Sequence, residues 1–259
     1  MKLSIITINY NNHVGLENTI KSVKSQSCHE FEYIIVDGDS TDGSKDILFK
    51  YSMEMPIKYK SEKDRGIYNA MNKAVLMSSG DYCIFMNSGD IFHDKNSVKN
   101  ALTYLDSDYD ILSGIGVVGG KDWMPVHEDG LSLSFFLKDS MNHQGTFIKR
   151  VLLLEHPYRE DLKISSDTEF FFYSLIIKSV RYMNIPVYIN ISEPPGASSQ
   201  LDLSLGERYS AIQDYLPPRM SYDVEFLIKH HNPVIKGIGN IMYNKLLRRV
   251  FHFFKYVLK

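Results

Sequence analysis

Two short stretches of the sequence place carboxylate and amide side chains beside apolar residues. Residues 64–72 are Asp-Arg-Gly-Ile-Tyr-Asn-Ala-Met-Asn, and residues 87–90, which follow an apolar run, are Asn-Ser-Gly-Asp. A strand that ends in such groups can present oxygen ligands to a hard cation, and the cation can bridge phosphates. We therefore expect Asp90 to bind Mg²⁺ or Mn²⁺ together with a phosphate-bearing ligand; a simple turn at the strand end is the alternative.

Polar residues also follow other apolar runs of the first half. Asn9 and Tyr10 follow the run that starts at residue 3, Asp37 and Asp39 follow 31–36, and Asp64 and Arg65 come shortly after 57–61. Ligands of open parallel sheets bind beyond the carboxyl ends of the strands, so these groups are expected to share one edge. A single loop of this kind would be read as an ordinary solvent-exposed polar turn, but four such loops in this order favour a binding site.

The side chains at these strand ends suit a nucleotide. Asp37 can accept a hydrogen bond from the ring N–H of uracil or guanine, Tyr10 can lie against the base, and Asp39 adds a second polar contact. The alternative for residues 37–44 is an Asx-rich turn that caps a helix, and such a turn does not exclude binding.

Residues 64–72, which follow the expected strand at 57–61, can contact the diphosphate and sugar of such a ligand. The Arg65 guanidinium can bind a diphosphate or pair with Asp64, and Asp64 can touch a sugar; a surface salt bridge is the alternative. Asn69 and Asn72 are three residues apart and share a helix face. We include Asn69 and Asn87 among the expected nucleotide or sugar contacts.

The elements that would position these residues alternate along the chain. Apolar β-branched runs predict strands at 3–8, 31–36, 57–61 and 82–86, and helices are expected at 14–26, 45–51 and 67–79. This order is typical of a parallel, doubly wound α/β sheet. In the second half, strands are expected at 111–118, 147–148 and 187–191, a connection at 119–130, and a helix at 167–177 with Asp167 near its start.

Size and cysteine content set outer limits on the class of protein. The chain has 259 residues, of which 44% are hydrophobic, so it can bury a full core in one large α/β domain or two small ones. Its two cysteines form no CxxC pair and its start is not signal-like, which fits a reducing cytoplasm. No apolar run reaches the roughly 18 residues that would span a bilayer.

Basic residues concentrate at the end of a chain whose net charge is −2. Between residue 226 and the end there are seven Lys and Arg and no acid. From 241 to 259 they recur at spacings of three and four opposite an aromatic-rich apolar face, which is typical of a helix lying on an anionic membrane surface. Docking on the body of the protein is the alternative, and nucleic-acid binding is disfavoured because the rest of the chain is acidic.

Taken in order, these motifs resemble those of the inverting glycosyltransferases of family 2. The resemblance covers roughly residues 1–195 and is closest to bacterial exopolysaccharide enzymes of the colanic-acid type, which carry similar Asp/Asn-Gly-Ile-Tyr-x-Ala-Met-Asn and Asn-Ser-Gly-Asp phrases; in this chain Arg65 stands directly before Gly66. It implies an α/β fold of the GT-A type with a mixed central sheet. The implied parts are a Rossmann-like nucleotide-binding half at 1–105, an acceptor-binding half at 106–200 and a helical C-terminal extension at 201–259.

The resemblance also implies roles for single residues. Asp37 occupies the position that reads the base, although the usual Asp-Asp-Gly-Ser is Asp-Gly-Asp-Ser here, and residues 87–90 stand where the family has Asp-x-Asp. Residues 142–147 match the segment beside the diphosphate, so His143 would complete the metal shell or contact phosphate; a structural histidine is the alternative. Asp167 matches the catalytic base, with Glu169 as second choice and a helix-capping Asp as the alternative.

The implied reaction is sugar transfer with inversion, in which Asp167 deprotonates an acceptor hydroxyl as a nucleoside diphosphate leaves on the metal. The donor would be a nucleoside diphosphate sugar, with UDP slightly preferred over GDP. The acceptor would be a saccharide or polyprenyl-linked saccharide at the inner face of the bacterial plasma membrane. Two alternatives stay open: a nucleotidyltransferase, for which residues 9–15 lack a basic phosphate loop, and a non-catalytic sugar- or nucleotide-binding protein.

Overall fold

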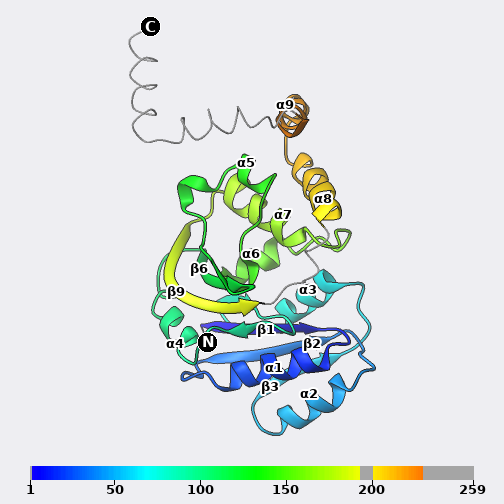
Figure 1. The fold of residues 1–259 in the computed structure, drawn as a ribbon, viewed down its shortest axis with the longest axis vertical. Helices are drawn as coiled ribbons and strands as arrows, with labels where there is room; N and C mark the ends of the chain where they lie inside the picture. The colour runs from blue at the N-terminus through cyan, green and yellow to red at the C-terminus, as the bar shows by residue number, and fades with distance from the viewer. Residues whose placement is uncertain (1, 193–200, 230–259) are drawn as a thin grey trace. The chain divides into compact units, whose positions relative to one another are not determined.

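A computed structural model describes residues 2–192 and 201–229 (Figure 1). Contacts divide the chain into one compact unit, Met1–Ile212, and a second, Gln213–Lys259. The predicted nucleotide-binding and acceptor-binding halves both fall within the first unit, where they share one sheet.

The first unit is built on a mixed sheet of nine strands in the order β3-β2-β1-β4-β8-β6-β9-β5, with β7 beside β6. The strands are β1 (Leu3–Asn9), β2 (Phe31–Asp37), β3 (Ile57–Ser61), β4 (Tyr82–Phe85), β5 (Ile91–Phe92), β6 (Ile111–Val118), β7 (Lys121–Trp123), β8 (Thr146–Lys149) and β9 (Tyr182–Ser192). The first four run parallel, and β8 is antiparallel to both of its neighbours. This arrangement confirms the predicted α/β class with a mixed sheet.

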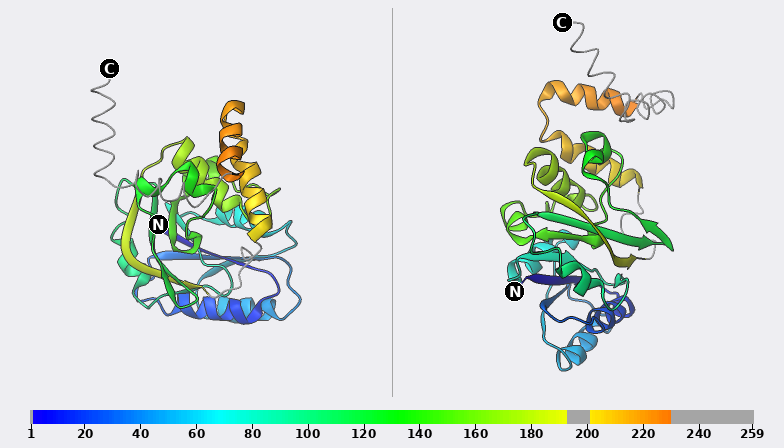
Figure 2. Two further views of the ribbon diagram at one scale, coloured as in Figure 1. Left: turned by 45° about the horizontal axis from the view of Figure 1, so that its top comes forward. Right: turned by 90° about the vertical axis from the view of Figure 1, so that its left-hand side faces the viewer.

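Helices cover both faces of this sheet. The first unit contains α1 (His13–Lys24), α2 (Ser44–Ser52), α3 (Ile67–Met77), α4 (Ser97–Leu102), α5 (Leu133–Phe136), α6 (Arg150–Glu155), α7 (Ser166–Phe172) and α8 (Leu201–Gln213), with 3-10 turns η1 (Glu128–Gly130) and η2 (His143–Gly145) and the π-helical turn η3 (Tyr173–Ile177) after α7. Helices α1 and α2 lie on one face of β1 to β3, and α3 lies on the other (Figure 1). Figure 2 shows the long, curved β9 along the second half of the sheet.

The parallel strands β1, β2 and β4 are rich in apolar residues because they are covered on both faces, whereas the edge strand β3 is largely exposed. All seven residues of β1 and all four of β4 are buried, which is the pattern of a central strand in a doubly wound sheet. Ile5, Ile35 and Ile84 pack in one core with Leu16 and Ile20 of α1. The core therefore fixes the strands whose polar ends were expected to carry the ligand.

The structure also contains elements that the sequence pattern did not predict. Two of them, β5 and β7, have two and three residues, and α4 and α6 have six each. Elements this short do not complete a period of hydrophobicity, so pattern reasoning misses them. The expected connection 119–130 contains β7 and η1, and β9 begins five residues before the predicted strand at 187.

In the second unit, α9 spans Pro218–Lys229. The predicted basic helix at 241–259 lies outside the described residues. Within the described stretches, no helix combines the length and the hydropathy needed to cross a bilayer.

Candidate active site

Asp37 is the most firmly held carboxylate at the ends of the parallel strands. It ends β2 in register with Asn9 of β1 and is fully buried. Its oxygens accept hydrogen bonds from Ser40 Oγ (2.5 Å), Ser61 Oγ (2.7 Å) and Asn9 Nδ2 (2.7 Å). Burial by itself would raise the pKa of Asp37, but these hydrogen bonds outweigh it and lower the pKa below its ordinary value. Asp37 is therefore a fixed, charged acceptor.

Tyr10 and Asp64 meet beside Asp37, at Gly38. A Cβ atom added to Gly38 would lie 2.6 Å from Asp64 Oδ2 and 3.0 Å from Tyr10 Cδ2, so a larger residue would displace these side chains. The ring of Tyr10 is 67% exposed and is available to a planar ligand. The structure thus brings together three of the residues expected to contact the nucleotide, and it gives a steric reason for glycine in the Asp-Gly-Asp-Ser segment.

Asp39 is engaged differently. It has a left-handed backbone (φ 66°), and its Oδ1 atom is 2.5 Å from Nζ of Lys45, in α2. Both side chains are partly exposed, so this ion pair contributes little to stability. The expected contact of Asp39 with the nucleotide stays a prediction.

Arg65 and Asn69 converge on Glu160, a residue that the sequence analysis did not select. Arg65 Nε is 3.1 Å and Asn69 Nδ2 is 3.0 Å from Glu160 Oε2. The hydrogen bond from Asn69, with those from Arg65 and Asn72, lowers the pKa of Glu160 despite partial burial. The structure therefore places Arg65 in an ion pair with Glu160, and diphosphate contacts of Arg65 and Asn69 stay predictions.

Asp90 has the surroundings expected of a metal ligand. It is 9% exposed, and burial raises its pKa to about 6 despite hydrogen bonds with Ser192 and Gln144. The nearby Asn87 Oδ1 and Ser88 Oγ are buried and lack a hydrogen-bond partner among the described residues. A buried carboxylate whose pKa is raised and a buried amide oxygen are the kind of oxygen donors that Mg²⁺ and Mn²⁺ take.

These groups fit a cation that keeps several ligands of its own. Among the described residues no three His, Cys, Asp or Glu side chains are placed to hold a metal together. Asp90 and Asn87 would therefore supply the protein ligands, and phosphate oxygens and water would supply the others, as is common for Mg²⁺.

His143, the second expected metal ligand, lies in an aromatic cluster. Its Nε2 atom is 3.2 Å from the Tyr158 hydroxyl, and its ring centroid is 4.9 Å from that of Phe85. Burial lowers the pKa of His143 and keeps the ring neutral. It is the neighbouring Gln144 that contacts Asp90, and the sequence analysis missed it although both belong to the same motif. Metal binding by His143 stays a prediction.

Asp167 and Glu169 lie in the same helix, α7, but in different surroundings. Asp167 is half-buried, and its Oδ1 atom accepts a hydrogen bond of 3.0 Å from the Tyr68 hydroxyl. Glu169 is fully buried, with Oε1 3.0 Å from His156 Nε2. The half-buried Asp167 can reach a substrate hydroxyl, whereas the carboxylate of Glu169 is packed inside the protein against His156. This difference favours Asp167 over Glu169 as the proposed base.

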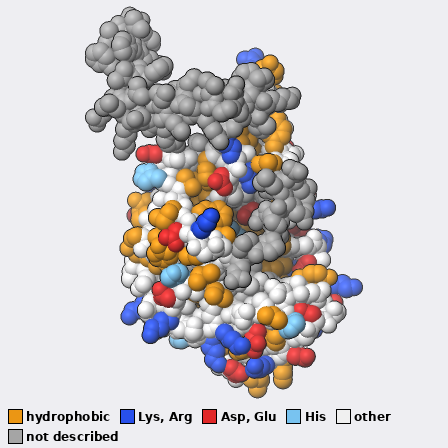
Figure 3. All heavy atoms as spheres, in the orientation of Figure 1, with side chains coloured by type: hydrophobic (Ala, Val, Ile, Leu, Met, Phe, Trp, Pro, Cys, Tyr) orange, Lys and Arg blue, Asp and Glu red, His pale blue; other side chains and the backbone are white. Residues whose placement is uncertain are grey.

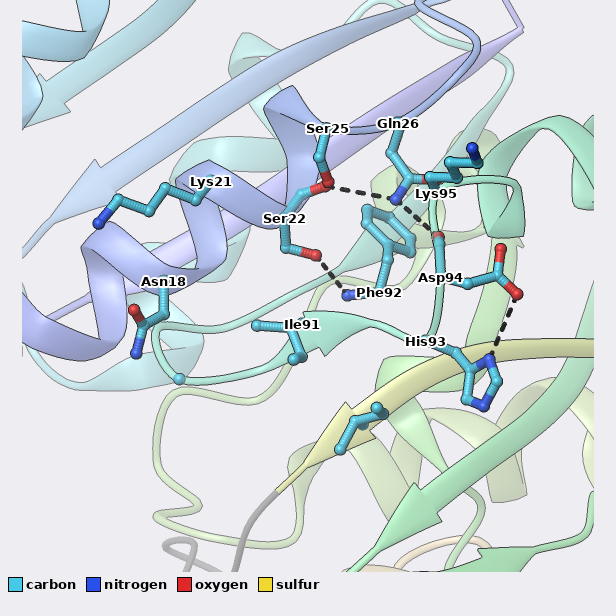
Figure 4. Close-up of a pocket in the computed structure, with 12 residues that line it drawn as sticks. Asn18, Lys21, Ser22, Ser25, Gln26, Ile91, Phe92, His93, Asp94 and Lys95 are labelled. Atoms are coloured by element: carbon cyan, nitrogen blue, oxygen red, sulfur yellow. Dashed lines mark hydrogen bonds and ion pairs between the residues drawn. The ribbon is translucent and has the colours of Figure 1, made fainter.

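An open groove of about 640 Å³ lies beside Asp90, between α1 and residues 91–95 (Figure 4). Ser22 Oγ accepts a hydrogen bond from Phe92 N (2.8 Å), and Gln26 Nε2 donates one to Asp94 O (2.9 Å). Ser22 of α1 and Gln26, two residues after the helix, therefore hold β5 and the residues that follow it. On the face shown in Figure 3, acidic and basic side chains of the described residues are interspersed, without a continuous basic stripe.

The mixed sheet and the polar strand ends define an α/β protein of the GT-A fold class. The model of the family described as glycosyl transferase family 2 matches residues 4–154, and the chain belongs to this family. An uncharacterized glycosyltransferase of Mycobacterium tuberculosis (strain ATCC 25618 / H37Rv) is 33% identical over 179 residues, 65% of this chain and 66% of that protein. TuaG of Bacillus subtilis (strain 168), named for teichuronic acid biosynthesis, is 40% identical over 106 residues, 40% of this chain and 41% of TuaG. The chain thus spans slightly less than two thirds of the length of the first relative.

Solved structures share the fold at low sequence identity. S. aureus TarS 1-349 superposes with a TM-score of 0.66 and 20% identity, over 82% of this chain and 64% of that one. The mannosyltransferase PcManGT of Pyrobaculum calidifontis, solved with GDP-Man and Mn²⁺, has a TM-score of 0.66 and 15% identity over 99% of this chain and 80% of that one. These similarities confirm the predicted GT-A fold.

Proposed function

We propose that this protein transfers a sugar, with inversion, from a nucleoside diphosphate sugar to a saccharide or lipid-linked saccharide of the bacterial cell surface. The observation that carries the proposal is the placement of two carboxylates at or beyond the ends of β2 and β4, the two strands that flank β1. One of them, Asp37, is charged and lies beside the exposed Tyr10 ring; the other, Asp90, is buried and follows Asn87, whose amide oxygen has no hydrogen-bond partner among the described residues. Asp37 is suited to hydrogen-bond to the nucleobase, and Asp90 is suited to bind a cation that carries the diphosphate.

The residues divide the reaction among them. Asp37 accepts a hydrogen bond from the nucleobase, and the Tyr10 ring stacks on the nucleobase. Asp90 would hold Mg²⁺ or Mn²⁺. The cation, when bound, neutralises charge on the departing diphosphate. As the bond between the anomeric carbon and the diphosphate oxygen breaks, the acceptor oxygen forms a bond to that carbon from the opposite side, and its proton passes to Asp167.

The relatives support a class of product and leave the donor open. TarS has been solved with UDP-GlcNAc and PcManGT with GDP-Man and Mn²⁺; we keep UDP as the preferred nucleotide of this chain. TuaG is named for teichuronic acid biosynthesis and a Mycobacterium bovis relative for PGL/p-HBAD biosynthesis. Because these are different surface glycoconjugates, we propose that broader class rather than exopolysaccharides of the colanic-acid type.

Replacing Asp37 with Asn is expected to weaken the binding of UDP at least tenfold, with or without Mn²⁺, because the variant loses the charged acceptor for the base. Isothermal titration of the variant with UDP measures this. Glu32→Gln is the matched control, since Glu32 is a buried, hydrogen-bonded carboxylate at the other end of β2. We expect both variants to lose stability but only Asp37→Asn to lose affinity. Equal UDP affinity in both variants would remove Asp37 from the site.

We also propose that residues 241–259 attach the protein to the inner face of the plasma membrane, on the basis of their sequence alone. Each basic residue near an anionic surface contributes about 1 kcal/mol, so several together give salt-sensitive attachment. Deleting 241–259 should abolish sedimentation with phosphatidylglycerol vesicles and leave UDP binding intact. Equal vesicle binding by both forms, or failure of the shorter form to fold, would favour docking of this segment on the protein.

A further inference from the structure

The polar face of α3 contacts the segment that leads to Asp167. Asn72 binds the backbone of Tyr158 twice, through Asn72 Nδ2 to Tyr158 O (2.8 Å) and from Tyr158 N to Asn72 Oδ1 (3.0 Å). Asn69 and Arg65 bind Glu160, as described above. One helix of the donor half therefore holds the chain at three successive points between residues 158 and 167.

The third point is the hydroxyl of Tyr68, which reaches the proposed base itself. Tyr68 Oη is 2.5 Å from Ile164 O and 3.0 Å from Asp167 Oδ1. The side chain is 5% exposed, and burial, with the charge of Asp167, raises the pKa of Tyr68 well above its ordinary value. The phenol therefore stays protonated, and its single O–H is shared between the two oxygens in a three-centre hydrogen bond, whose contact with Oδ1 restrains the orientation of the carboxylate.

The residues directly before the N-terminus of α3 belong to the proposed donor site. Asp64, which meets Tyr10 at Gly38, accepts a hydrogen bond from Gly66 N (2.9 Å) directly before the helix. Tyr68 follows two residues later in the first turn of α3. Only three residues therefore separate Asp64, a proposed donor contact, from the tyrosine that hydrogen-bonds to Asp167.

We infer that Tyr68 is a positioning residue, which holds the Asp167 carboxylate at a fixed place relative to the donor through its hydroxyl. The inference rests on the proposed role of Asp167. It gives a function to Tyr68 of the Gly-Ile-Tyr-Asn-Ala-Met-Asn segment, a residue to which the proposed nucleobase and metal contacts assign no role. Because small displacements of a general base slow proton transfer, removal of the hydroxyl should lower kcat and leave the affinity for the donor unchanged.

The test is a double-mutant cycle with Tyr68→Phe, Asp167→Asn and the double variant. Nucleoside diphosphate release is measured with the UDP- or GDP-sugar that most stabilises the protein in a thermal-shift panel with Mn²⁺. We expect Tyr68→Phe to lower kcat about 10- to 100-fold with an unchanged Kd for UDP, and to have less than a twofold effect in the Asp167→Asn background. Tyr33→Phe, which removes a buried hydroxyl bonded to Thr7 Oγ1, is the matched control and should keep kcat.

The outcomes separate this inference from the proposed function. If Asp167→Asn abolishes turnover while Tyr68→Phe behaves like Tyr33→Phe, the positioning role is wrong and the base assignment stands. An equal loss from Tyr68→Phe in both backgrounds would also overturn it, because the hydroxyl would then act independently of Asp167. Wild-type turnover in Asp167→Asn would overturn the proposed base itself.

Discussion

The variant Asp167→Asn is expected to release nucleoside diphosphate two to four powers of ten more slowly than the wild type, on the order of what a general base contributes. Asn has nearly the same shape, and its Oδ1 atom can still accept the hydrogen bond from Tyr68. It cannot accept a proton from the acceptor hydroxyl. Affinity for the donor, measured by titration with UDP and Mn²⁺, should therefore be retained.

Glu169→Gln is the control for this prediction because Glu169 lies two residues away in the same helix. Its carboxylate is fully buried against His156, so the substitution should affect thermal stability more than turnover. If the folded Glu169→Gln protein loses turnover and Asp167→Asn keeps it, the base is Glu169.

The second large effect is expected on Mn²⁺-dependent nucleotide binding when the proposed metal ligand Asp90 is replaced. Asp90→Asn should lower the Mn²⁺-dependent part of UDP affinity at least 100-fold, because the variant lacks the carboxylate proposed to hold the cation. Titration with UDP in the presence and absence of Mn²⁺ isolates that part. Asp81→Asn, which alters an exposed carboxylate just before β4, is the control and should leave the Mn²⁺ dependence intact.

The raised pKa of Asp90 gives this site a pH dependence with a definite sign. With a pKa of about 6 in the metal-free protein, the carboxyl group is protonated below pH 6 and must lose its proton to bind a cation. Mn²⁺ affinity should therefore be constant above about pH 7 and fall roughly tenfold per pH unit below pH 6. Unchanged Mn²⁺ affinity between pH 5 and 8, or an unaltered Mn²⁺ response in Asp90→Asn, would contradict the assignment.

The first half of the fold follows from local patterns in the sequence. Strands β1, β2 and β4 are buried on both faces, so each appears as a predominantly apolar run without the alternation of a half-exposed strand. Their parallel pairing then brings the polar residues at their ends together, as expected for Asn9 and Asp37. This is why the donor residues could be proposed as one group before their positions were known.

The contacts between the two halves do not follow from such patterns. Tyr68 and Asp167 are 99 positions apart, and Glu160 is 95 positions from Arg65. The helical spacing of apolar residues predicts which face of α3 is buried, but it does not predict which distant segment supplies the hydrogen-bond partners of the polar face. For the same reason the family resemblance could suggest His143 as a metal ligand, which stays a prediction, but it could not reveal that the side chain of the adjacent Gln144 hydrogen-bonds to Asp90.

The measurement that tests the central claim most directly is product analysis with a panel of UDP- and GDP-sugars, supplied with Mn²⁺ or with EDTA. We predict that one donor yields free nucleoside diphosphate only in the presence of Mn²⁺, and that the released or transferred sugar has the anomeric configuration opposite to that of the donor. Pyrophosphate formation from a nucleoside triphosphate and a sugar phosphate, with no turnover of any nucleotide sugar, would instead identify a nucleotidyltransferase. Tight binding of a nucleotide sugar without any turnover in the presence of acceptor saccharides would contradict catalysis altogether.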